Sequence, residues 1–193
     1  MSSPSDVRLE AGDALLIVDV QRDFLPGGSL AVTAGDQVIA PLNASIHRFA
    51  QAGLPVYATR DWHPPDHCSF REQGGMWPSH CVAGQPGAEF AASLALPATA
   101  RIISKATQRE ADAYSGLAGT DLDAQLRHAG VRRLFVGGLA TDYCVLNTVN
   151  DALHLGYAVV LLIDAMRAVD VQPGDGARAI AAMLAAGAVA AEG

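Results

Sequence analysis

Cys144 carries a thiol, an intrinsically strong nucleophile, near the predicted start of a helix. It lies in the stretch GGLATDYCVLN (137–147), after an apolar run and near the start of a helical pattern. A free thiol has a pKa of about 8.5, and a helix N-terminus or a nearby cation lowers that value. A cysteine near a helix start more often serves as a small core residue. A catalytic role therefore requires a base, a cation and a pocket at the same place.

Three other polar residues stand at the ends of apolar runs that are typical of buried strands. They are Asp19 in ALLIVDV (14–20), Asp61 after LPVYATR (54–60) and Lys105 in ARIISK (100–105). The carboxyl ends of parallel strands meet at one edge of a sheet, where ligands bind in open α/β folds. Alone, a strand-end aspartate often caps a turn and a strand-end lysine is usually solvated. Their conjunction with a thiol favours a shared site.

These groups have the chemistry of nucleophilic catalysis. Lys105 supplies a cation, Asp19 accepts the thiol proton as a general base, and Cys144 attacks the substrate. This requires the strand of Asp19 to neighbour the strand before Cys144. The glycine pair at 137–138 permits a close approach of the backbone and a sharp turn. The backbone N–H groups of Ala140 and Cys144 are candidates for an oxyanion hole.

A histidine-rich segment at about 61–100 predicts a metal site. Asp61 and His63 are separated by one residue, so an extended backbone places both side chains on the same side. Carboxylate and imidazole suit zinc, iron or manganese. We expect His80, which follows a Trp-Pro pair, to be the third ligand. His67 is either a fourth ligand or a residue that contacts the ligands, and the alternative for each histidine is a hydrogen bond to the backbone.

Two aromatic residues flank the same crevice. Phe24 lies in RDFLPGG and Trp77 lies in MWPSH. Packing in the core is the ordinary role of such side chains. A flat aromatic substrate held between them is the more specific interpretation, and the two roles are compatible.

The elements that must position these residues alternate between strands and helices. Further strands are expected at 131–138 and 157–164, helices at 34–53, 120–130, 142–156 and 174–187, and a short last strand at 188–190. This alternation predicts an α/β fold, a doubly wound parallel sheet with helices on both faces and right-handed crossovers. The irregular segment is long for a compact domain, which indicates that it has a function.

The composition limits the class of protein. The chain has 193 residues, half of them hydrophobic, which favours one domain over 1–193. A net charge of −7 argues against nucleic acid and anionic membranes as partners. The first residues are polar, and the alanine-rich stretch near the end is shorter than the roughly 20 apolar residues that span a bilayer. We expect a cytoplasmic protein.

The cysteines do not form a disulfide pattern. Cys68, Cys81 and Cys144 are odd in number, and free thiols in a reducing compartment are expected. Cys68 and Cys81 are next to the loop histidines and could ligate a structural zinc. Their spacing does not match a paired Cys-x-x-Cys motif, so this alternative is disfavoured.

Five stretches, in order, resemble the nicotinamidases of the isochorismatase-like cysteine hydrolase superfamily. They are LLIVDVQRDFLPGGSLAV, ATRDWHPPDHCSF, MWPSHCVAGQPGAEF, SKATQREADAYSGLAGTDL and GLATDYCVLNTVNDA, within about residues 13 to 170. The resemblance implies a three-layer fold with a six-stranded parallel sheet. It also implies hydrolysis of nicotinamide to nicotinate and ammonia through a thioester, in NAD salvage.

The resemblance also assigns roles to residues. It implies a catalytic triad of Asp19, Lys105 and Cys144, and an oxyanion hole at Ala140 and Cys144 after a cis peptide between Leu139 and Ala140. It implies one divalent metal on Asp61, His63 and His80, with His67 in or near that set. Phe24 and Trp77 would hold the pyridine ring, with its nitrogen toward the metal. Ala106 stands where many members have glycine, and its small size leaves the triad intact.

Three alternatives remain open from the sequence. Another amidohydrolase of the superfamily could act on a carbamoyl or ureido substrate, although such relatives generally lack the metal histidines. An isochorismatase would not need Cys144 as a nucleophile. A non-catalytic module could bind metal and use Cys144 as a redox sensor. The native metal and the activity on pyrazinamide are not determined by the sequence, and exposed apolar helices make a homo-oligomer possible.

Overall fold

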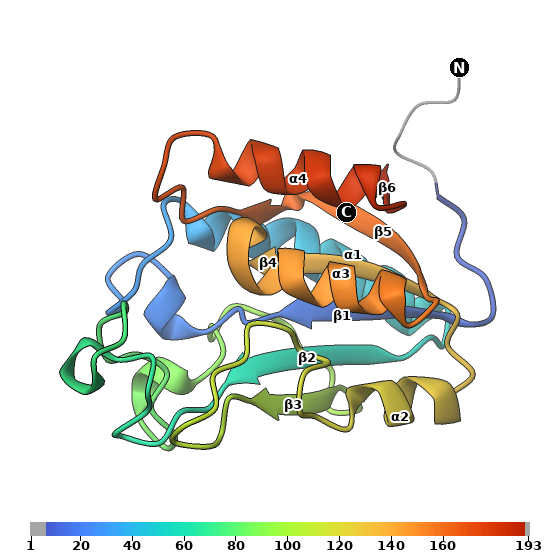
Figure 1. Ribbon diagram of the computed structural model, residues 1–193. Helices are drawn as coiled ribbons and strands as arrows, with labels where there is room; N and C mark the ends of the chain where they lie inside the picture. Colours follow the sequence, from blue (N-terminus) through green and yellow to red (C-terminus); the bar gives the residue numbers. More distant parts are fainter. Residues whose placement is uncertain (1–6, 192–193) are drawn as a thin grey trace.

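The computed structural model describes residues 7–191 and contains one six-stranded sheet (Figure 1). Its strands are β1 (Asp13–Val18), β2 (Val56–Asp61), β3 (Arg101–Lys105), β4 (Arg133–Leu139), β5 (Ala158–Arg167) and β6 (Val189–Ala191). All neighbours are parallel, in the order β3-β2-β1-β4-β5-β6. This confirms the predicted doubly wound sheet, with the reversal of strand order between β1 and β4. Residues 1–6 and 192–193 of the expected domain 1–193 lie outside the described part.

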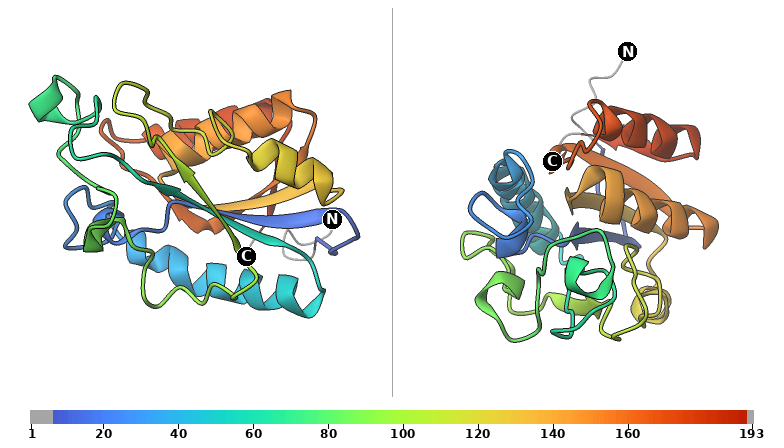
Figure 2. Two further views of the ribbon diagram at one scale, coloured as in Figure 1. Left: turned by 90° about the horizontal axis from the view of Figure 1, so that it is seen from below. Right: turned by 60° about the vertical axis from the view of Figure 1, so that its left-hand side comes forward.

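Within the described residues, four α-helices cover the sheet on both faces. They are α1 (Ile39–Gln51), α2 (Leu122–His128), α3 (Leu146–His154) and α4 (Asp175–Ala185). Figure 2 shows α1 on one side of the sheet and the other three on the opposite side. No helix in the described range 7–191 combines the length and the apolarity needed to cross a bilayer.

The two faces of β1 explain this layering. All six of its residues are buried, as expected for a central parallel strand. Leu15 and Ile17 belong to the core that contains Leu42 of α1. The intervening Leu16 joins the core that contains Val149 of α3. Alternation along one strand therefore builds both hydrophobic layers.

Most element boundaries shift by one to several residues from the sequence-based prediction; the helix expected at 34–53, for example, spans Ile39–Gln51 after a 3-10 turn (Gly35–Val38). Two further differences bear on the site. β5 continues to Arg167 rather than ending at Asp164, because the ladder with β4 shifts register and then resumes at Gly138 and Met166. The helix expected at 142–156 begins as a π-helical turn (Thr141–Val145) before α3. That turn carries Cys144.

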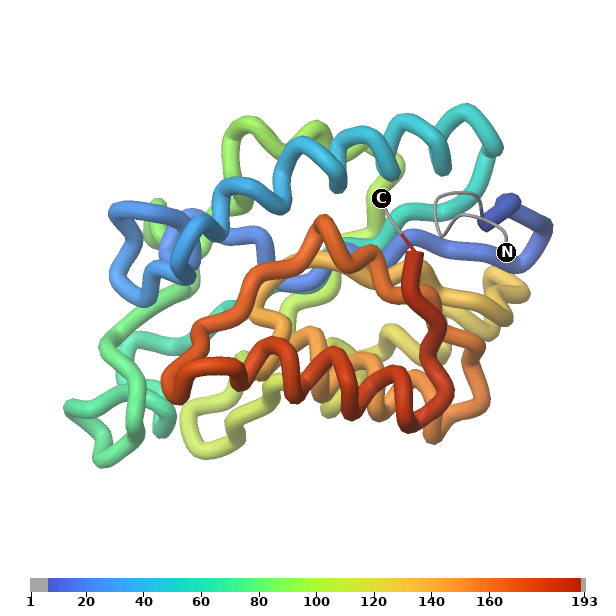
Figure 3. Tube along the Cα trace, turned by 90° about the horizontal axis from the view of Figure 1, so that it is seen from above, coloured from blue at the N-terminus to red at the C-terminus, as the bar shows by residue number. Residues whose placement is uncertain are grey.

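The segment between β2 and β3 has little regular structure, as predicted. Within 62–100 it contains two short 3-10 turns, Arg71–Gln73 and Pro86–Ala88. In Figure 3 the protruding part of this segment lies at the same end of the molecule as the connection after β1. The irregular backbone thus surrounds the edge where the parallel strands end.

Candidate active site

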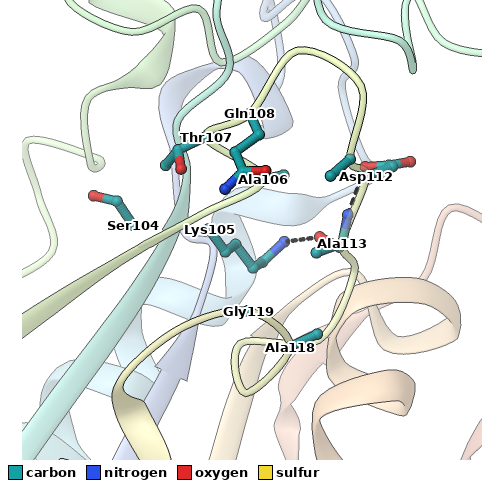
Figure 4. Close-up of a pocket in the computed structure, with 10 residues that line it drawn as sticks. Ser104, Lys105, Ala106, Thr107, Gln108, Asp112, Ala113, Ala118 and Gly119 are labelled. Atoms are coloured by element: carbon teal, nitrogen blue, oxygen red, sulfur yellow. Dashed lines mark hydrogen bonds between the residues drawn. The ribbon is translucent and has the colours of Figure 1, made fainter.

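A buried lysine connects the candidate catalytic residues. Lys105, at the end of β3, is 1% exposed. Its Nζ lies 2.5 Å from Asp61 Oδ1, 3.0 Å from Asp19 Oδ2 and 3.5 Å from Cys144 Sγ. It also donates a hydrogen bond of 3.1 Å to the Ala113 carbonyl, which is drawn in Figure 4. The structure thus brings the three residues of the expected triad together around one ammonium group.

The strand pairing produces this convergence. β1 pairs with β4, as the expected crevice requires, and Asp61 of β2 is in register with Lys105 of β3. Asp19 follows β1 directly, with a left-handed φ of 48°. Cys144 follows β4 on the π-helical turn. Four strand ends therefore deliver the reactive groups to one edge.

Gly138 allows β4 to approach β1 closely at this edge. Its φ is +128°, and a Cβ at this position would lie 2.1 Å from the Val18 carbonyl oxygen. The glycine predicted to allow a close backbone approach before Cys144 is therefore required for steric reasons. The following Leu139–Ala140 peptide is cis, as the resemblance implies.

Thr59 orients the Asp19 carboxylate and was not identified from the sequence. Its Oγ1 donates a hydrogen bond of 2.7 Å to Asp19 Oδ1. An ammonium has three hydrogens, and those of Lys105 are directed at Asp61, Ala113 and Cys144. Asp19 Oδ2 is therefore close to a positive charge but accepts no hydrogen bond within residues 7–191. This oxygen is available to accept a proton from the thiol.

The electrostatics differ from the expectation of a lowered thiol pKa. Burial raises the pKa of Cys144 well above its ordinary value, since Lys105 offsets only part of the cost and Asp19 opposes the thiolate. Burial also raises the pKa of Asp19, against the attraction of Lys105. Burial alone would lower the pKa of Lys105, but Asp19 and Asp61 raise it. The resting site thus favours a neutral thiol beside an ammonium, and catalysis needs a base.

Asp61, His63 and His80 form a group suited to a metal ion. Their ligand atoms all lie within 4.8 Å of one another. His63 Nδ1 faces the Ala106 carbonyl at 3.0 Å, and His80 Nδ1 faces the Pro78 carbonyl at 2.8 Å. A carbonyl only accepts hydrogen bonds, so each Nδ1 carries the proton and each Nε2 presents a lone pair.

An unsatisfied nitrogen supports this fit. His63 Nε2 is buried and has no hydrogen-bond partner among the described residues. A buried polar atom without a partner is costly unless a ligand satisfies it. Burial would raise the pKa of Asp61, but Lys105 and His63 together keep it below its ordinary range, so the carboxylate stays anionic. Two imidazoles and a carboxylate match the preferences of zinc, iron and manganese.

His67 lies beside this group rather than within it. Its ring stacks on His63 with centroids 4.2 Å apart. Its Nδ1 is 2.8 Å from Ser69 Oγ, and its Nε2 is 3.3 Å from the Ala111 carbonyl. Both ring nitrogens are engaged, so the structure places His67 as a neighbour of the candidate ligands.

One pocket joins the thiol to Asp61 and His80, two of the three candidate metal ligands. It is lined by Phe24, Leu30, Val32, Asp61, Trp77, His80, Tyr114, Ala140, Tyr143, Cys144 and Val169. An apolar wall with a few polar groups is typical of a small-molecule site. The predicted pair of aromatic residues, Phe24 and Trp77, thus reaches the same cavity as Cys144.

Two tyrosines in this pocket were not identified from the sequence. Trp77 Nε1 donates a hydrogen bond of 3.0 Å to Tyr114 Oη. Tyr143 meets the Trp77 ring edge-on, with centroids 5.1 Å apart. Tyr143 precedes Cys144 directly, a position that could have marked it as a pocket residue. Tyr114 lies in a loop with no local signal, and only the tertiary structure reveals its contact.

A second pocket borders Lys105 on another side. It is polar and lies between the end of β3 and residues 106–119 (Figure 4). Its lining in the described chain includes neither Cys144 nor any of the three candidate metal ligands. The pocket that contains the thiol is therefore the better candidate for the chemistry.

Several known proteins are similar to this chain in sequence and in architecture. The family model described as the isochorismatase domain matches residues 13–192. The nicotinamidase of Escherichia coli is 41% identical over 196 residues, which cover 91% of this chain and 92% of that protein. The crystal structure of the pyrazinamidase of Pyrococcus horikoshii in complex with zinc is 48% identical, with a TM-score of 0.91 over 94% of this chain and 99% of that one. The structure of PnC1 from L. infantum in complex with nicotinate is 38% identical, with a TM-score of 0.88 over 96% of both chains. The chain belongs to the isochorismatase family.

Proposed function

We propose that this protein is a nicotinamidase, a metal-containing cysteine amidohydrolase that converts nicotinamide to nicotinate and ammonia. The observation that carries the proposal is the buried Lys105 ammonium, which lies beside both Cys144 and Asp19. Cys144 in turn shares one pocket with Asp61 and His80 of the candidate metal group. The likeness to nicotinamidases and a pyrazinamidase supports the substrate class.

The first half-reaction forms a thioester. Asp19 Oδ2 takes the thiol proton while Cys144 Sγ attacks the amide carbon. The carbonyl oxygen becomes an oxyanion, which the N–H groups of Ala140 and Cys144 stabilise. Asp19 then returns the proton to the amide nitrogen, the C–N bond breaks, and ammonia leaves. Lys105 keeps its positive charge throughout and stabilises the negative charge of the reacting groups.

The second half-reaction releases the acid. Asp19 takes a proton from a water molecule, whose oxygen adds to the thioester carbon. The C–S bond breaks, Cys144 leaves as a thiolate, and it recovers the proton from Asp19. The free enzyme and nicotinic acid result, and the acid then loses its proton to solvent to give nicotinate.

The role of the candidate metal group in this proposal is to position the substrate. Asp61, His63 and His80 would hold one divalent ion of zinc, iron or manganese. When bound, such an ion supplies a Lewis acid that orients a ligand through a lone pair, here the pyridine nitrogen. Phe24 and Trp77, which line the same pocket, would contact the faces of the pyridine ring.

The test is ammonia release from nicotinamide. The wild-type protein is expected to release ammonia and nicotinate in equal amounts, and Cys144→Ala to release neither. Cys68→Ala is the matched control, since Cys68 is another free thiol, half-buried and outside the pocket lining. Ammonia release by Cys144→Ala at the wild-type rate would exclude the thioester route.

The alternatives make different predictions in the same assay. A carbamoyl or ureido hydrolase would release ammonia from those compounds and not from nicotinamide. A redox-sensing module would release none from either. The unsatisfied His63 Nε2 favours a metal-containing enzyme over a metal-free one. A nicotinamidase of this type would act in cytoplasmic NAD salvage, as a monomer or a homo-oligomer.

A further inference from the structure

Asp23 lies outside the pocket lining but touches the backbone that carries the metal ligands. It belongs to a 3-10 turn (Arg22–Phe24) that follows β1. Its Oδ2 accepts a hydrogen bond of 2.7 Å from the Cys81 N–H, and its Oδ1 accepts one of 3.4 Å from the Ser29 N–H. We propose that Asp23 is a positioning residue that sets the metal affinity of the Asp61–His63–His80 group by fixing the backbone of Cys81. This inference rests on the proposed metal site.

Cys81 connects to both histidines of that group. It follows His80 directly in the chain, and its carbonyl accepts a hydrogen bond of 3.0 Å from the His63 N–H. The His63 carbonyl in turn accepts a hydrogen bond of 2.8 Å from the Ala83 N–H. A movement of Cys81 would therefore displace both imidazoles relative to each other.

The conformation of Cys81 requires external support. Its φ is +46°, in the left-handed region that non-glycine residues seldom adopt. Its side chain is fully buried, so its amide needs a partner within the protein. Asp23 supplies that partner, and the resulting charge-assisted hydrogen bond is short.

The absence of a side chain at Gly87 leaves room for the Asp23 carboxylate. A Cβ at Gly87 would lie 2.1 Å from Asp23 Oδ2. The positions with positive φ in the described chain do not include Gly87, so its backbone tolerates alanine. Gly87→Ala would therefore push the carboxylate away from Cys81 without removing its charge. This separates the position of Asp23 from its electrostatic effect.

The experiment measures zinc affinity of the metal-free protein by competition with a chromophoric chelator. Partners that orient metal ligands contribute about 10- to 100-fold in affinity. We expect a loss of that order for Asp23→Ala, which removes the acceptor of the Cys81 N–H, and for Gly87→Ala. Asp66→Ala is the matched control, because it removes a half-exposed carboxylate that pairs with Arg109 and lies in the segment that carries His63 and His80. Far-UV circular dichroism of the metal-free variants verifies that they are folded.

The outcomes are distinguishable. Wild-type zinc affinity in both variants would overturn the positioning role. A loss in Asp23→Ala with wild-type affinity in Gly87→Ala would assign the effect to charge and would overturn it as well. A wild-type protein that binds no stoichiometric zinc, iron or manganese would remove the metal site itself, and with it both this inference and the metal part of the proposed function.

Discussion

Around Cys144, burial disfavours the thiolate. The thiol pKa is raised, and so is that of Asp19, because both groups are desolvated. Lys105 compensates by placing one positive charge between two carboxylates and the sulfur. The raised pKa of the thiol favours proton transfer to Asp19 during attack over a preformed thiolate.

Asp19→Asn should remove the base with little change in shape. An amide cannot take the thiol proton, and positioned general bases contribute about 10²- to 10⁴-fold to rate. We expect a loss of that size in kcat for ammonia release from nicotinamide. Asp36→Asn, an exposed change of equal charge, serves as the control. A kcat close to that of the wild-type protein would show that another group accepts the proton.

The pH dependence should report the protonation of Asp19. The carboxylate form is active, so kcat/KM should rise as pH increases through its pKa and then level off. Burial raises this pKa above the ordinary value of 3.8, so the acid limb should lie above that pH. Initial rates across the acid range measure it. A midpoint at or below 3.8 would contradict the assigned environment.

The reactive residues could be predicted from the sequence, whereas the residues that orient them could not. Cys144 and Lys105 stand out because a thiol and an ammonium are unusual at the ends of apolar runs. Thr59 does not stand out, since a threonine within a strand is ordinary. Its role depends on the neighbouring strand, whose carboxylate it meets at 2.7 Å. Contacts between distant segments of this kind have no local signature.

At the scale of elements, the β1–β4 contact determines how closely the strand ends approach. Gly138→Ala combines an unfavourable positive φ with a collision against the Val18 carbonyl. Gly187→Ala is a matched control, because its φ is +114° but nothing lies within 4 Å of the added Cβ. Backbone strain alone costs about 1–3 kcal/mol. We expect Gly138→Ala to lower the free energy of unfolding by about 1–3 kcal/mol more than Gly187→Ala, because of overpacking.

Denaturant unfolding of the two alanine variants measures this difference. Equal losses would mean that β1 and β4 separate easily at Gly138, and the steric account of the glycine would be wrong. An additional fall in activity for Gly138→Ala would follow from displacement of Cys144, which lies just beyond β4.

Local patterns predicted elements but not all of their boundaries. The helical spacing of Leu42, Ile46 and Phe49 is a property of α1 alone, and all three are buried. The end of β5 depends instead on pairing with β4 after a register shift. Asp164 lies inside β5, but in the sequence alone it resembles the end of the strand. Non-local hydrogen bonds thus set the boundary.

At the scale of the whole molecule, the candidate metal group joins parts of the chain that have little regular structure between them. Asp61 ends β2, and His80 lies far along the irregular segment 62–100. Phe70, which is 1% exposed, packs edge-on against His63 and His80. Phe70 thus packs beside the metal ligands, whereas Ala88 and Leu94 of the same segment join the core that contains Leu42 of α1. We therefore expect the sheet to stay folded without metal.

Zinc should therefore stabilise the folded protein through this group. A ligand that binds only the folded state at about 100 times its Kd adds about 2.7 kcal/mol to the free energy of unfolding. We expect this increase for metal-free wild-type protein titrated with zinc and its reversal by a chelator, measured by denaturant unfolding. His80→Ala removes one imidazole from the group and should abolish most of the increase. The same zinc-dependent increase in His80→Ala would locate the stabilising ion elsewhere, because the remaining Asp61 and His63 provide too few ligands for a tight site.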